Sequence, residues 1–281
     1  MAGGPLAERI RAQVAEDVRG LGAIGLATVQ VGEDEASTIY LRLKHKAAAE
    51  VEILSVDRKF PHAISEEELL AEVTALNEDD SIDGILVQLP LPKHLDEARV
   101  IRAVDPVKDV DGFHPFNAGE LYLGRPTLVP ATPLGVMALL AEYKIPLDGA
   151  RAVVVGRSTI VGKPVAHLLL QANATVAICH SHTDDLERYT LDADVLVVAA
   201  GVPEVITADM VKSGSTVVDV GINRTAEGIV GDVDPDAAMH AAFLTPVPGG
   251  VGPMTIAMLL RNTVRAARYR RGVLAFPEVQ R

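Results

Sequence analysis

The sequence predicts an α/β protein of two domains, each built around a parallel β-sheet. The chain has 281 residues, which exceeds the usual size of a single domain. Its residues are 48% hydrophobic but only 4% aromatic, with no Trp, so Val, Ile, Leu and Ala must fill the interior. Such a composition suits buried parallel strands flanked by helices. Short apolar runs also alternate with segments of helical periodicity along the chain.

The first part of the chain predicts a β-α-β-α-β arrangement after an N-terminal amphipathic helix. Ser65 and Glu68 form a capping box at the start of one helix. Gln88 comes at the end of a buried apolar run that prolines terminate. The expected helices are 5–19, 36–51 and 65–79, and the expected strands are 26–31, 53–57 and 84–92.

A stretch rich in Pro, Gly and Asp, residues 105–133, has few helical or strand patterns. Long loops inside compact proteins are usually functional or connect domains, and domain junctions favour ligand clefts. We therefore expect both a boundary and a functional site here. The expected N-terminal substrate domain comprises residues 1–133 and 254–281, and the expected second domain comprises 134–253.

The second domain is predicted to be a doubly wound parallel sheet. Four short apolar runs are separated by segments long enough for helices. An Arg-rich helix follows Pro253 and closes the chain. The expected strands are 151–156, 174–179, 194–201 and 215–221, and the expected helices are 133–143 and 161–172.

The charge and cysteine content exclude several classes of function. A formal net charge of -12 repels nucleic acid and anionic membranes, so a small molecule is the expected partner. Cys179 is the only cysteine, which rules out an intrachain disulfide and fits a reducing cytoplasm. No apolar run reaches the about 18 residues of a membrane span, and the N-terminus does not resemble a signal peptide. No metal site is predicted.

The loop after residues 151–156 has the composition of a dinucleotide site. Gly156, Arg157, Ser158 and Gly162 stand between an apolar strand and a helix, where a Rossmann fold receives a pyrophosphate. The two glycines permit a tight turn and a close approach, and free N–H groups with the helix dipole attract the anion. Because Ser158 replaces the middle glycine of the G-x-G-x-x-G pattern, a βα turn without a ligand stays open as an alternative.

The end of the next strand favours NADP over NAD. An NAD site usually has Asp or Glu here to bind the ribose 2′-hydroxyl, whereas residues 179–182 read Cys-His-Ser-His. Ser181 and the guanidinium of Arg157 are able to bind a 2′-phosphate instead. The alternatives are an ordinary loop hydroxyl and a solvated surface charge.

Four residues of the first domain are candidates for substrate chemistry. Tyr40 and Lys44 are four apart on a predicted helix and therefore share a face. Gln88 ends a buried strand, and Asp111 lies in the Asp-rich loop. Spacing alone leaves structural alternatives: a tyrosine at a helix edge, an exposed lysine, a capped strand end and an Asp-Gly turn.

Seven segments together resemble the bifunctional methylenetetrahydrofolate dehydrogenase/methenyltetrahydrofolate cyclohydrolase family. They follow the family's order over nearly the whole chain: YLRLKHKA, DGILVQLPLP, KDVDGFHPFNAG, ATPLGV, VVVGRSTIVGKP, VVDVGIN and TPVPGGVGPMT. The resemblance implies NADP-dependent oxidation of 5,10-methylenetetrahydrofolate to the methenyl form, then hydrolysis to 10-formyltetrahydrofolate. Both reactions would use one site, in a cleft between the domains. It further implies a cytoplasmic homodimer in one-carbon metabolism and purine biosynthesis.

The resemblance also implies a role for each matching residue. Lys44 is the central catalytic group, Gln88 binds and tunes it, Tyr40 stacks on the folate and Asp111 holds the pterin. Family members that only dehydrogenate tend to lack this lysine, so its presence implies both activities. The other residues implied to contact folate are Val87, Leu89, Pro248, Gly249, Gly250, Val251 and Gly252. The residues implied to contact NADP are Gly156, Arg157, Ser158, Ser181 and Ile222.

Three alternatives remain open. Residues 248–252 are, on their composition alone, an unusual Gly-rich turn before a helix. A shikimate-dehydrogenase-like oxidoreductase acting on a hydroxy acid with NADP has a similar layout, but it needs no Tyr40–Lys44 pair beside Gln88. A non-catalytic nucleotide sensor has the same fold without the chemistry, and the presence of Lys44, Gln88 and Asp111 argues against it.

Overall fold

The computed structural model describes residues 1–226 and 228–277, apart from the side chains of residues 35–37. The chain divides into two compact units, each with its own parallel sheet, which confirms the predicted fold class. The three-stranded unit comprises Arg9–Ala131 and Ile256–Arg281. The five-stranded unit comprises Met1–Glu8 and Thr132–Thr255. Among the described residues, no helix combines the length and the apolar character that a membrane crossing requires.

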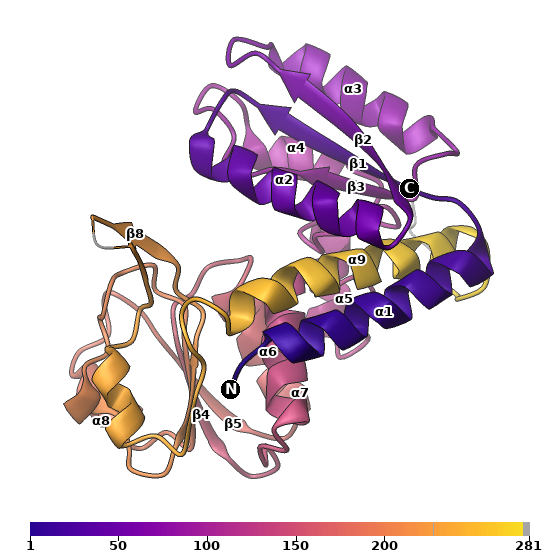
Figure 1. Ribbon diagram of the computed structural model, residues 1–281. Helices are drawn as coiled ribbons and strands as arrows, with labels where there is room; N and C mark the ends of the chain where they lie inside the picture. Colours follow the sequence, from indigo (N-terminus) through magenta and orange to yellow (C-terminus); the bar gives the residue numbers. More distant parts are fainter. Residues whose placement is uncertain (227, 278–281) are drawn as a thin grey trace. The chain divides into compact units, whose positions relative to one another are not determined.

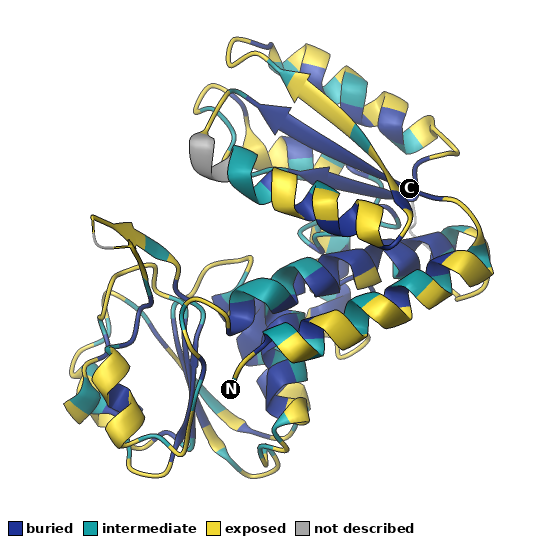
Figure 2. Cartoon of the chain, viewed as in Figure 1, coloured by how far each residue is buried: buried dark blue, intermediate teal, exposed yellow. Residues whose placement is uncertain are grey.

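The sheet of the three-stranded unit has the order β2-β1-β3, with all strands parallel. Every residue of β1 is buried, whereas most of β2 at the sheet edge is exposed (Figure 2). The burial of every residue of β1 therefore reflects a central strand covered on both faces. The strands are β1 (Ile24–Val31), β2 (Ile53–Phe60) and β3 (Gly84–Val87). Its helices, two of which continue into the other unit, are α1 (Gly4–Leu21), α2 (Glu35–Glu50), α3 (Glu66–Glu78), α4 (Glu97–Ala103), α5 (Pro115–Tyr122) and α9 (Val251–Arg270).

Helices α3 and α4 cover one face of this sheet (Figure 1). Successive residues of a strand point to opposite faces, so the odd-numbered residues of β1 and β3 form this core. Ser65 caps α3 as predicted: its Oγ accepts from the Glu68 N–H at 3.2 Å, and Glu68 Oε2 accepts from the Ser65 N–H at 3.0 Å. The core residues include Ala27, Val29, Val31, Leu69, Val73, Leu76, Ile85, Val87, Val100 and Val104.

The opposite face of β1 carries two buried polar residues that bind α2. Thr28 Oγ1 lies 2.8 Å from His45 Nε2, and Gln30 Nε2 donates to Thr38 Oγ1 at 2.9 Å. Both bonds form only at one rotation of α2 about its axis. They therefore determine which way the helix directs Lys44.

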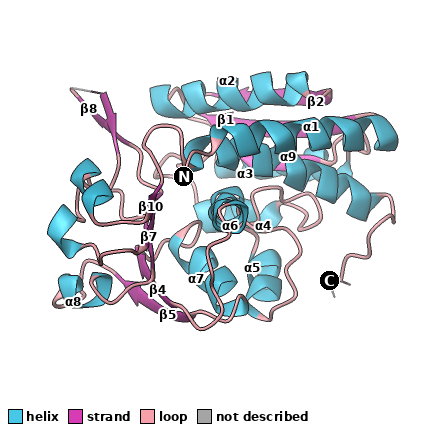
Figure 3. Ribbon diagram, turned by 60° about the horizontal axis from the view of Figure 1, so that its bottom comes forward, coloured by secondary structure: helices cyan, strands magenta, loops and turns pink. Residues whose placement is uncertain are grey.

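The five-stranded unit has the strand order β10-β7-β6-β4-β5, all parallel (Figure 3). The chain passes from β4 to β5 on one side and then to β6 on the other, which is the predicted doubly wound arrangement. Strands β8 and β9, which follow β7 in the chain, form a separate antiparallel hairpin. The strands are β4 (Arg151–Val155), β5 (Thr175–Cys179), β6 (Val195–Val198), β7 (Thr216–Asp219), β8 (Asn223–Thr225), β9 (Gly228–Val230) and β10 (Phe243–Leu244). The helices are α6 (Ala131–Glu142), α7 (Gly162–Gln171), α8 (Leu186–Thr190) and two 3₁₀ helices, η1 (Ala208–Met210) and η2 (Pro235–Met239).

The N-terminal residues depart from the expected boundaries, because Met1–Glu8 belong to the five-stranded unit. The Gly3 N–H donates to the Gly249 carbonyl at 2.9 Å, and Tyr143 Oη donates to the Ala2 carbonyl at 3.2 Å. The N-terminal ammonium donates to the Leu244 carbonyl. Hydrogen bonds to residues far along the chain thus hold the first residues to this unit, and no local sequence pattern predicts them.

Two local predictions are wrong. Residues 105–133 contain α5, whose first residue, Pro115, follows the N-cap His114, and His114 Nδ1 accepts from the Phe116 N–H at 3.0 Å. The strand expected over 84–92 ends at Val87, since the chain bends away before the prolines. Proline at the first helical position is a helix start signal, but the density of Gly and Pro around it favours a loop.

Candidate active site

Lys44 and Gln88 meet at the carboxyl end of β3. Lys44 Nζ donates to Gln88 Oε1 at 3.2 Å, and the lysine is only 8% exposed. Gln88 Nε2 donates to the Leu89 carbonyl at 2.7 Å, which turns the amide so that its oxygen faces the lysine. The Gln88 N–H donates to the Val29 carbonyl at 2.9 Å and anchors the residue to the sheet. The amide is thus held from both ends while it orients the lysine.

The charge of Lys44 is coupled to Asp111. Burial lowers the pKa of Lys44, and the negative charge of Asp111 opposes that effect. The pKa of the Asp111 carboxyl is raised to about 7, mainly by burial, with Asp109 adding to the increase and Lys44 opposing it. Burial thus favours the uncharged form of both groups. Near neutral pH, the Asp111 carboxyl is therefore able to gain or lose a proton at little free-energy cost.

Tyr40 lies one helical turn before Lys44, as the spacing predicts. Lys44 Nζ is 5.8 Å from the centroid of its ring, within the range of a cation–π contact. The tyrosine is half-buried, and burial raises the pKa of its phenol. The ring is therefore neutral and offers an aromatic face beside the lysine.

The two aspartates of the 109–111 segment have different surroundings. Asp109 is buried and accepts hydrogen bonds from the His114 N–H and Asn117 Nδ2, both at 2.8 Å, and from the Phe113 N–H at 3.2 Å. Within the part of the chain that the structure describes, Asp111 accepts no hydrogen bond and is half-buried. Asp109 organises the loop, and Asp111 keeps its oxygens available for a ligand.

The strand residues beside Gln88 have mainly structural contacts. Val87 is 7% exposed, and its side chain packs in the core against α3 and α4, on the face opposite to Gln88. Leu89 packs partly against the same core, and its carbonyl is bonded to Gln88. The contact of these two residues with folate stays a prediction. Because the side chain of Val87 is buried in the core, any contact of Val87 with folate would involve its backbone.

The glycines of the cofactor loop have no room for a side chain. Gly156 has a φ of 126°, and a Cβ added there would overlap the Ala199 carbonyl. A Cβ added to Gly162 would overlap the Gly156 carbonyl. The turn after β4, the start of α7 and the end of β6 therefore touch through backbone atoms. This is the close approach that a pyrophosphate site requires.

Ser158 corrects one detail of the prediction. Its Oγ accepts from the Val161 N–H at 3.1 Å and from the Gly162 N–H at 3.2 Å, so these two N–H groups are not free for an anion. Arg157 is exposed and makes no hydrogen bond or ion pair with the described residues. Attraction of a phosphate in this loop therefore depends mainly on Arg157 and the dipole of α7.

Ser181 lies at the same edge of the sheet as Arg157. The register of β4 and β5 pairs Val155 with Cys179, so each of the two residues follows its strand by two positions. Both side chains are exposed. Their positions are compatible with one phosphate group, and their roles stay predictions. The described residues include no group of three or more His, Cys, Asp or Glu placed to hold a metal ion.

Residues Pro248–Gly250 form a turn, and Val251 and Gly252 are the first residues of α9. The Gly250 N–H donates to the Pro246 carbonyl at 2.8 Å, and the helix begins at Val251. A Cβ added to Gly252 would lie 3.9 Å from Ile222 Cδ1, and Ile222 itself is 48% exposed. Ile222, predicted to contact NADP, thus adjoins the Gly-rich turn. The contact of this turn with folate stays a prediction.

Comparison with solved structures distinguishes a folate dehydrogenase/cyclohydrolase from a shikimate dehydrogenase. The chain is 48% identical to a bifunctional FolD methylenetetrahydrofolate dehydrogenase/cyclohydrolase from Campylobacter jejuni, with a TM-score of 0.94 over 96% of this chain and 98% of that one. A Trypanosoma brucei FolD, solved with NADP cofactor and inhibitor, is 38% identical with a TM-score of 0.92 and covers 98% of both chains. Shikimate dehydrogenase from Aquifex aeolicus is only 15% identical, with a TM-score of 0.53, a likeness of fold alone.

Family models and relatives agree with these structures. The catalytic-domain model of tetrahydrofolate dehydrogenase/cyclohydrolase matches residues 1–111, and the NAD(P)-binding-domain model matches residues 130–271. The bifunctional protein FolD of Polynucleobacter asymbioticus is 53% identical over 271 residues, covering 94% of this chain and 95% of its own. The counterpart from Enterococcus faecalis is 50% identical over 275 residues, covering 96% and 98%. The chain belongs to the tetrahydrofolate dehydrogenase/cyclohydrolase family.

Proposed function

We propose that the protein oxidises 5,10-methylenetetrahydrofolate with NADP and hydrolyses the methenyl product to 10-formyltetrahydrofolate. The observation that carries the proposal is the buried Lys44, hydrogen-bonded to Gln88 at 3.2 Å and lying beside Tyr40. About half of the residues are identical to those of relatives named as bifunctional proteins. Neither a hydroxy-acid dehydrogenase nor a nucleotide sensor requires this arrangement.

The five-stranded unit fits a dinucleotide. Gly156 and Gly162 leave the backbone bare where phosphates approach a helix N-terminus, and Arg157 and Ser181 supply donors at the same sheet edge. NADP, when bound, accepts the hydride that leaves the one-carbon bridge. The strand end at residues 179–182, Cys-His-Ser-His, carries no acid, which supports NADP rather than NAD.

In the oxidation, the residues of the three-stranded unit hold and stabilise the substrate. The face of Tyr40 stacks against an aromatic part of the folate, and the Asp111 carboxyl binds the pterin. Departure of hydride leaves a cation on the one-carbon bridge. A protonated lysine beside that carbon would raise its energy, so burial, which lowers the pKa of Lys44, favours this step.

In the hydrolysis, Lys44 handles the proton of water. Water adds to the methenyl carbon, and one of its protons passes to the neutral Nζ of Lys44, leaving a hydroxyl on a tetrahedral carbon. The bond from that carbon to N5 then breaks, N5 takes a proton, and the hydroxyl loses its proton to become the formyl oxygen. One proton is released overall. Gln88 Oε1 holds Nζ in line throughout, because its own amide is fixed by the Leu89 carbonyl.

The remaining assignments are part of the same proposal. The three-stranded unit binds folate, and the five-stranded unit binds NADP. The protein acts as a homodimer in the cytoplasm, in the one-carbon metabolism that supplies purine biosynthesis. Family membership supports each of these assignments.

The test mixes the protein with methylenetetrahydrofolate and NADP, and follows the absorbance of the methenyl product as it appears and decays. Both phases are expected with the unaltered protein. Lys44→Met should abolish the decay, because no amine is left to take the proton, while Lys46→Met, an exposed lysine of the same helix, should change neither phase. Absence of methenyl formation by the unaltered protein, or undiminished hydrolysis by Lys44→Met, would overturn the proposal.

A further inference from the structure

Two aspartates of the five-stranded unit are buried side by side although the proposed chemistry does not use them. Asp232 is fully buried, and Asp219 is 3% exposed. We infer that Asp232, supported by Asp219, is a positioning residue that holds one wall of the dinucleotide crevice. The inference rests on the proposed binding of NADP by this unit.

The carboxylate of Asp232 binds two loops at once. Its Oδ2 accepts from the backbone N–H groups of Ala200 at 2.7 Å and Gly201 at 2.8 Å, directly after β6. Its Oδ1 accepts from Asn223 Nδ2 at 2.8 Å, after β7. Ala200 and Gly201 are exposed residues outside any helix or strand, so their backbone depends on this carboxylate for its conformation.

Asp219 in turn holds Asp232. Its carboxylate accepts from the N–H groups of Gly221 at 2.9 Å and of Asp232 and Val233 at 3.0 Å. Its own N–H donates to Thr245 Oγ1 at 2.8 Å, in the segment that precedes the Pro248–Gly250 turn. One buried network therefore fixes the ends of β6 and β7 and the approach to α9.

Two positions beside the buried carboxylates have room only for glycine. A Cβ at Gly221 would overlap the carboxylate of Asp232, and a Cβ at Gly231 would overlap that of Asp219. Each carboxylate thus fills the space that a side chain would need. Gly221 directly precedes Ile222, the residue predicted to contact NADP, so the network also determines the position of Ile222.

The anchored residues lie where a doubly wound sheet binds its ligand. Strand order reverses between β4 and β6, and ligands bind beyond the carboxyl ends of the strands at such a point. The Ala199 N–H donates to the Val155 carbonyl at 2.7 Å, and Gly156 packs on the Ala199 carbonyl. Ala200 and Gly201 therefore continue from the strand end that touches the glycine loop. Asp232 directs their N–H groups into the protein and sets the shape of that side of the crevice.

A purely stabilising role does not account for the pair. Burial raises the pKa of Asp219 and the charge of Asp232 adds to the increase, so that the pKa reaches about 6 although backbone N–H groups lower it. Burying two carboxyl groups in one site is destabilising relative to apolar side chains of similar volume. The compensating contribution is the set of hydrogen bonds that the two carboxylates accept from loops next to the crevice, and these bonds fix the positions of the loops.

The test compares Asp232→Ala and Asp232→Asn with Asp236→Ala, a change at an exposed residue whose side chain makes no hydrogen bond with the described residues. The dissociation constant of NADPH is measured by fluorescence, and KM for NADP and for folate by turnover. Asp232→Ala should weaken both NADPH binding and KM for NADP at least about tenfold, with KM for folate and the hydrolysis rate within about twofold. Asp232→Asn should lie in between, since its remaining oxygen still accepts from the two N–H groups. Asp236→Ala should match the unaltered protein.

Unchanged NADPH binding in Asp232→Ala, or an equal loss of every kinetic parameter, would refute the positioning role. If Asp232→Ala does not fold, hydrogen exchange of the Ala200 and Gly201 amides in the unaltered protein decides. Slow exchange at these exposed positions supports the anchor, and exchange as fast as in an unstructured loop refutes it. The proposed function fails separately, because it fails when the unaltered protein produces no methenyl folate, whatever its NADPH affinity.

Discussion

Gln88 presents an amide oxygen, and not a carboxylate, to the Nζ of Lys44 at 3.2 Å. An amide accepts the hydrogen bond but carries no charge, so it orients the lysine without the strong increase in pKa that an anion would cause. Burial therefore lowers the pKa of Lys44, and only the charge of Asp111 opposes this effect. The identity of residue 88 therefore controls the protonation state of the lysine.

Gln88→Glu should shift the pH profile of the hydrolysis upward. The new carboxylate would stabilise the ammonium form of Lys44 and raise its pKa, so less neutral amine is present at neutral pH. We expect kcat for hydrolysis to fall at least about tenfold near pH 7 and to recover partly as the pH rises. The measurement is kcat against pH for methenyl hydrolysis. Gln13→Glu, an exposed position on α1, serves as the control, and a profile of Gln88→Glu that overlays it would contradict the prediction.

Asp111→Asn should change the pH dependence of stability. Burial raises the folded-state pKa of this carboxyl to about 7, above its ordinary value of 3.8, so the folded protein binds the proton more tightly than the unfolded chain. The stabilising contribution of the protonated group is complete below about pH 4 and is lost as the pH rises through about 7. In the unaltered protein, ionisation of Asp111 therefore lowers the free energy of unfolding as the pH rises from about 4 to about 7.

Urea unfolding of both proteins at about pH 5 and about pH 8 checks this expectation, because asparagine does not titrate. The decrease in stability from the lower to the higher pH should be smaller in Asp111→Asn. An identical decrease in the two proteins would mean that Asp111 is already ionised in the fold at the lower pH.

Arg157→Ala should weaken NADP more than NAD. The guanidinium is exposed and makes no hydrogen bond or ion pair with the described residues, so it is available to a 2′-phosphate that NAD lacks. Loss of a charged hydrogen bond costs about 1.5–3 kcal/mol, or roughly 10- to 150-fold in affinity, and solvent exposure favours the lower end. KM for NADP and for NAD is measured in Arg157→Ala and in Arg188→Ala, another exposed arginine of the same unit. Equal losses for the two dinucleotides would remove Arg157 from 2′-phosphate recognition.

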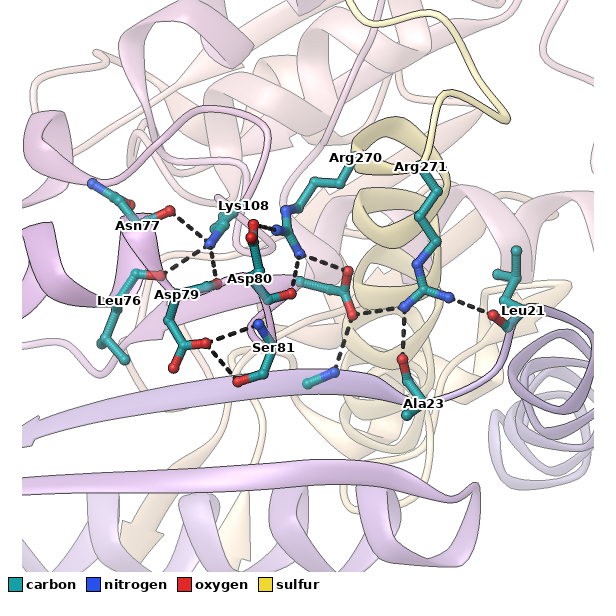
Figure 4. Close-up of polar contacts among 12 residues, drawn as sticks. Leu21, Ala23, Leu76, Asn77, Asp79, Asp80, Ser81, Lys108, Arg270 and Arg271 are labelled. Carbon is teal, nitrogen blue, oxygen red and sulfur yellow. Dashed lines mark hydrogen bonds and ion pairs between the residues drawn. The ribbon is translucent and has the colours of Figure 1, made fainter.

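Lys108→Met should destabilise the three-stranded unit. Lys108 Nζ donates to the carbonyls of Leu76, Asn77 and Asp79 at 3.0, 2.7 and 2.8 Å, and so satisfies the C-terminal end of α3 (Figure 4). Methionine keeps much of the apolar stem but leaves these carbonyls without their donor, at a cost of about 1–3 kcal/mol. Urea unfolding is the measurement, with the exposed Lys93→Met as control. A loss no greater than that of the control would show that water satisfies these carbonyls equally well.

Patterns local in the sequence predicted most of the fold and the three-stranded part of the site. The capping box of Ser65 and Glu68 marks the start of α3, and it forms as expected. Tyr40 and Lys44 share a helix face because four residues make about one turn, and Gln88 reaches them because it ends a buried strand. In each case a short-range periodicity or signal was sufficient.

Features that depend on distant contacts were missed. Asp232 lies 32 residues after Ala200, and nothing in its own neighbourhood distinguishes it from the exposed Asp236, four residues later. The bonds that Ser158 accepts from Val161 and Gly162 were missed for a different reason. A glycine-rich pattern indicates where an anion approaches, but it does not show which N–H groups a hydroxyl already occupies.

Helix α9, the last helix of the chain, supplies hydrogen bonds that the three-stranded unit needs, so the order of synthesis affects when this unit becomes stable. Asn262 in α9 donates to the carbonyls of Val110 and Val129, both at 2.8 Å, and Arg270 donates to Asp83 at 2.9 Å. These partners are separated by 152, 133 and 187 positions along the sequence. A ribosome that has produced all three strands of the sheet must still synthesise residues Thr132–Thr255 of the five-stranded unit before these groups are satisfied. The sheet that emerges first is therefore the last to reach its final stability.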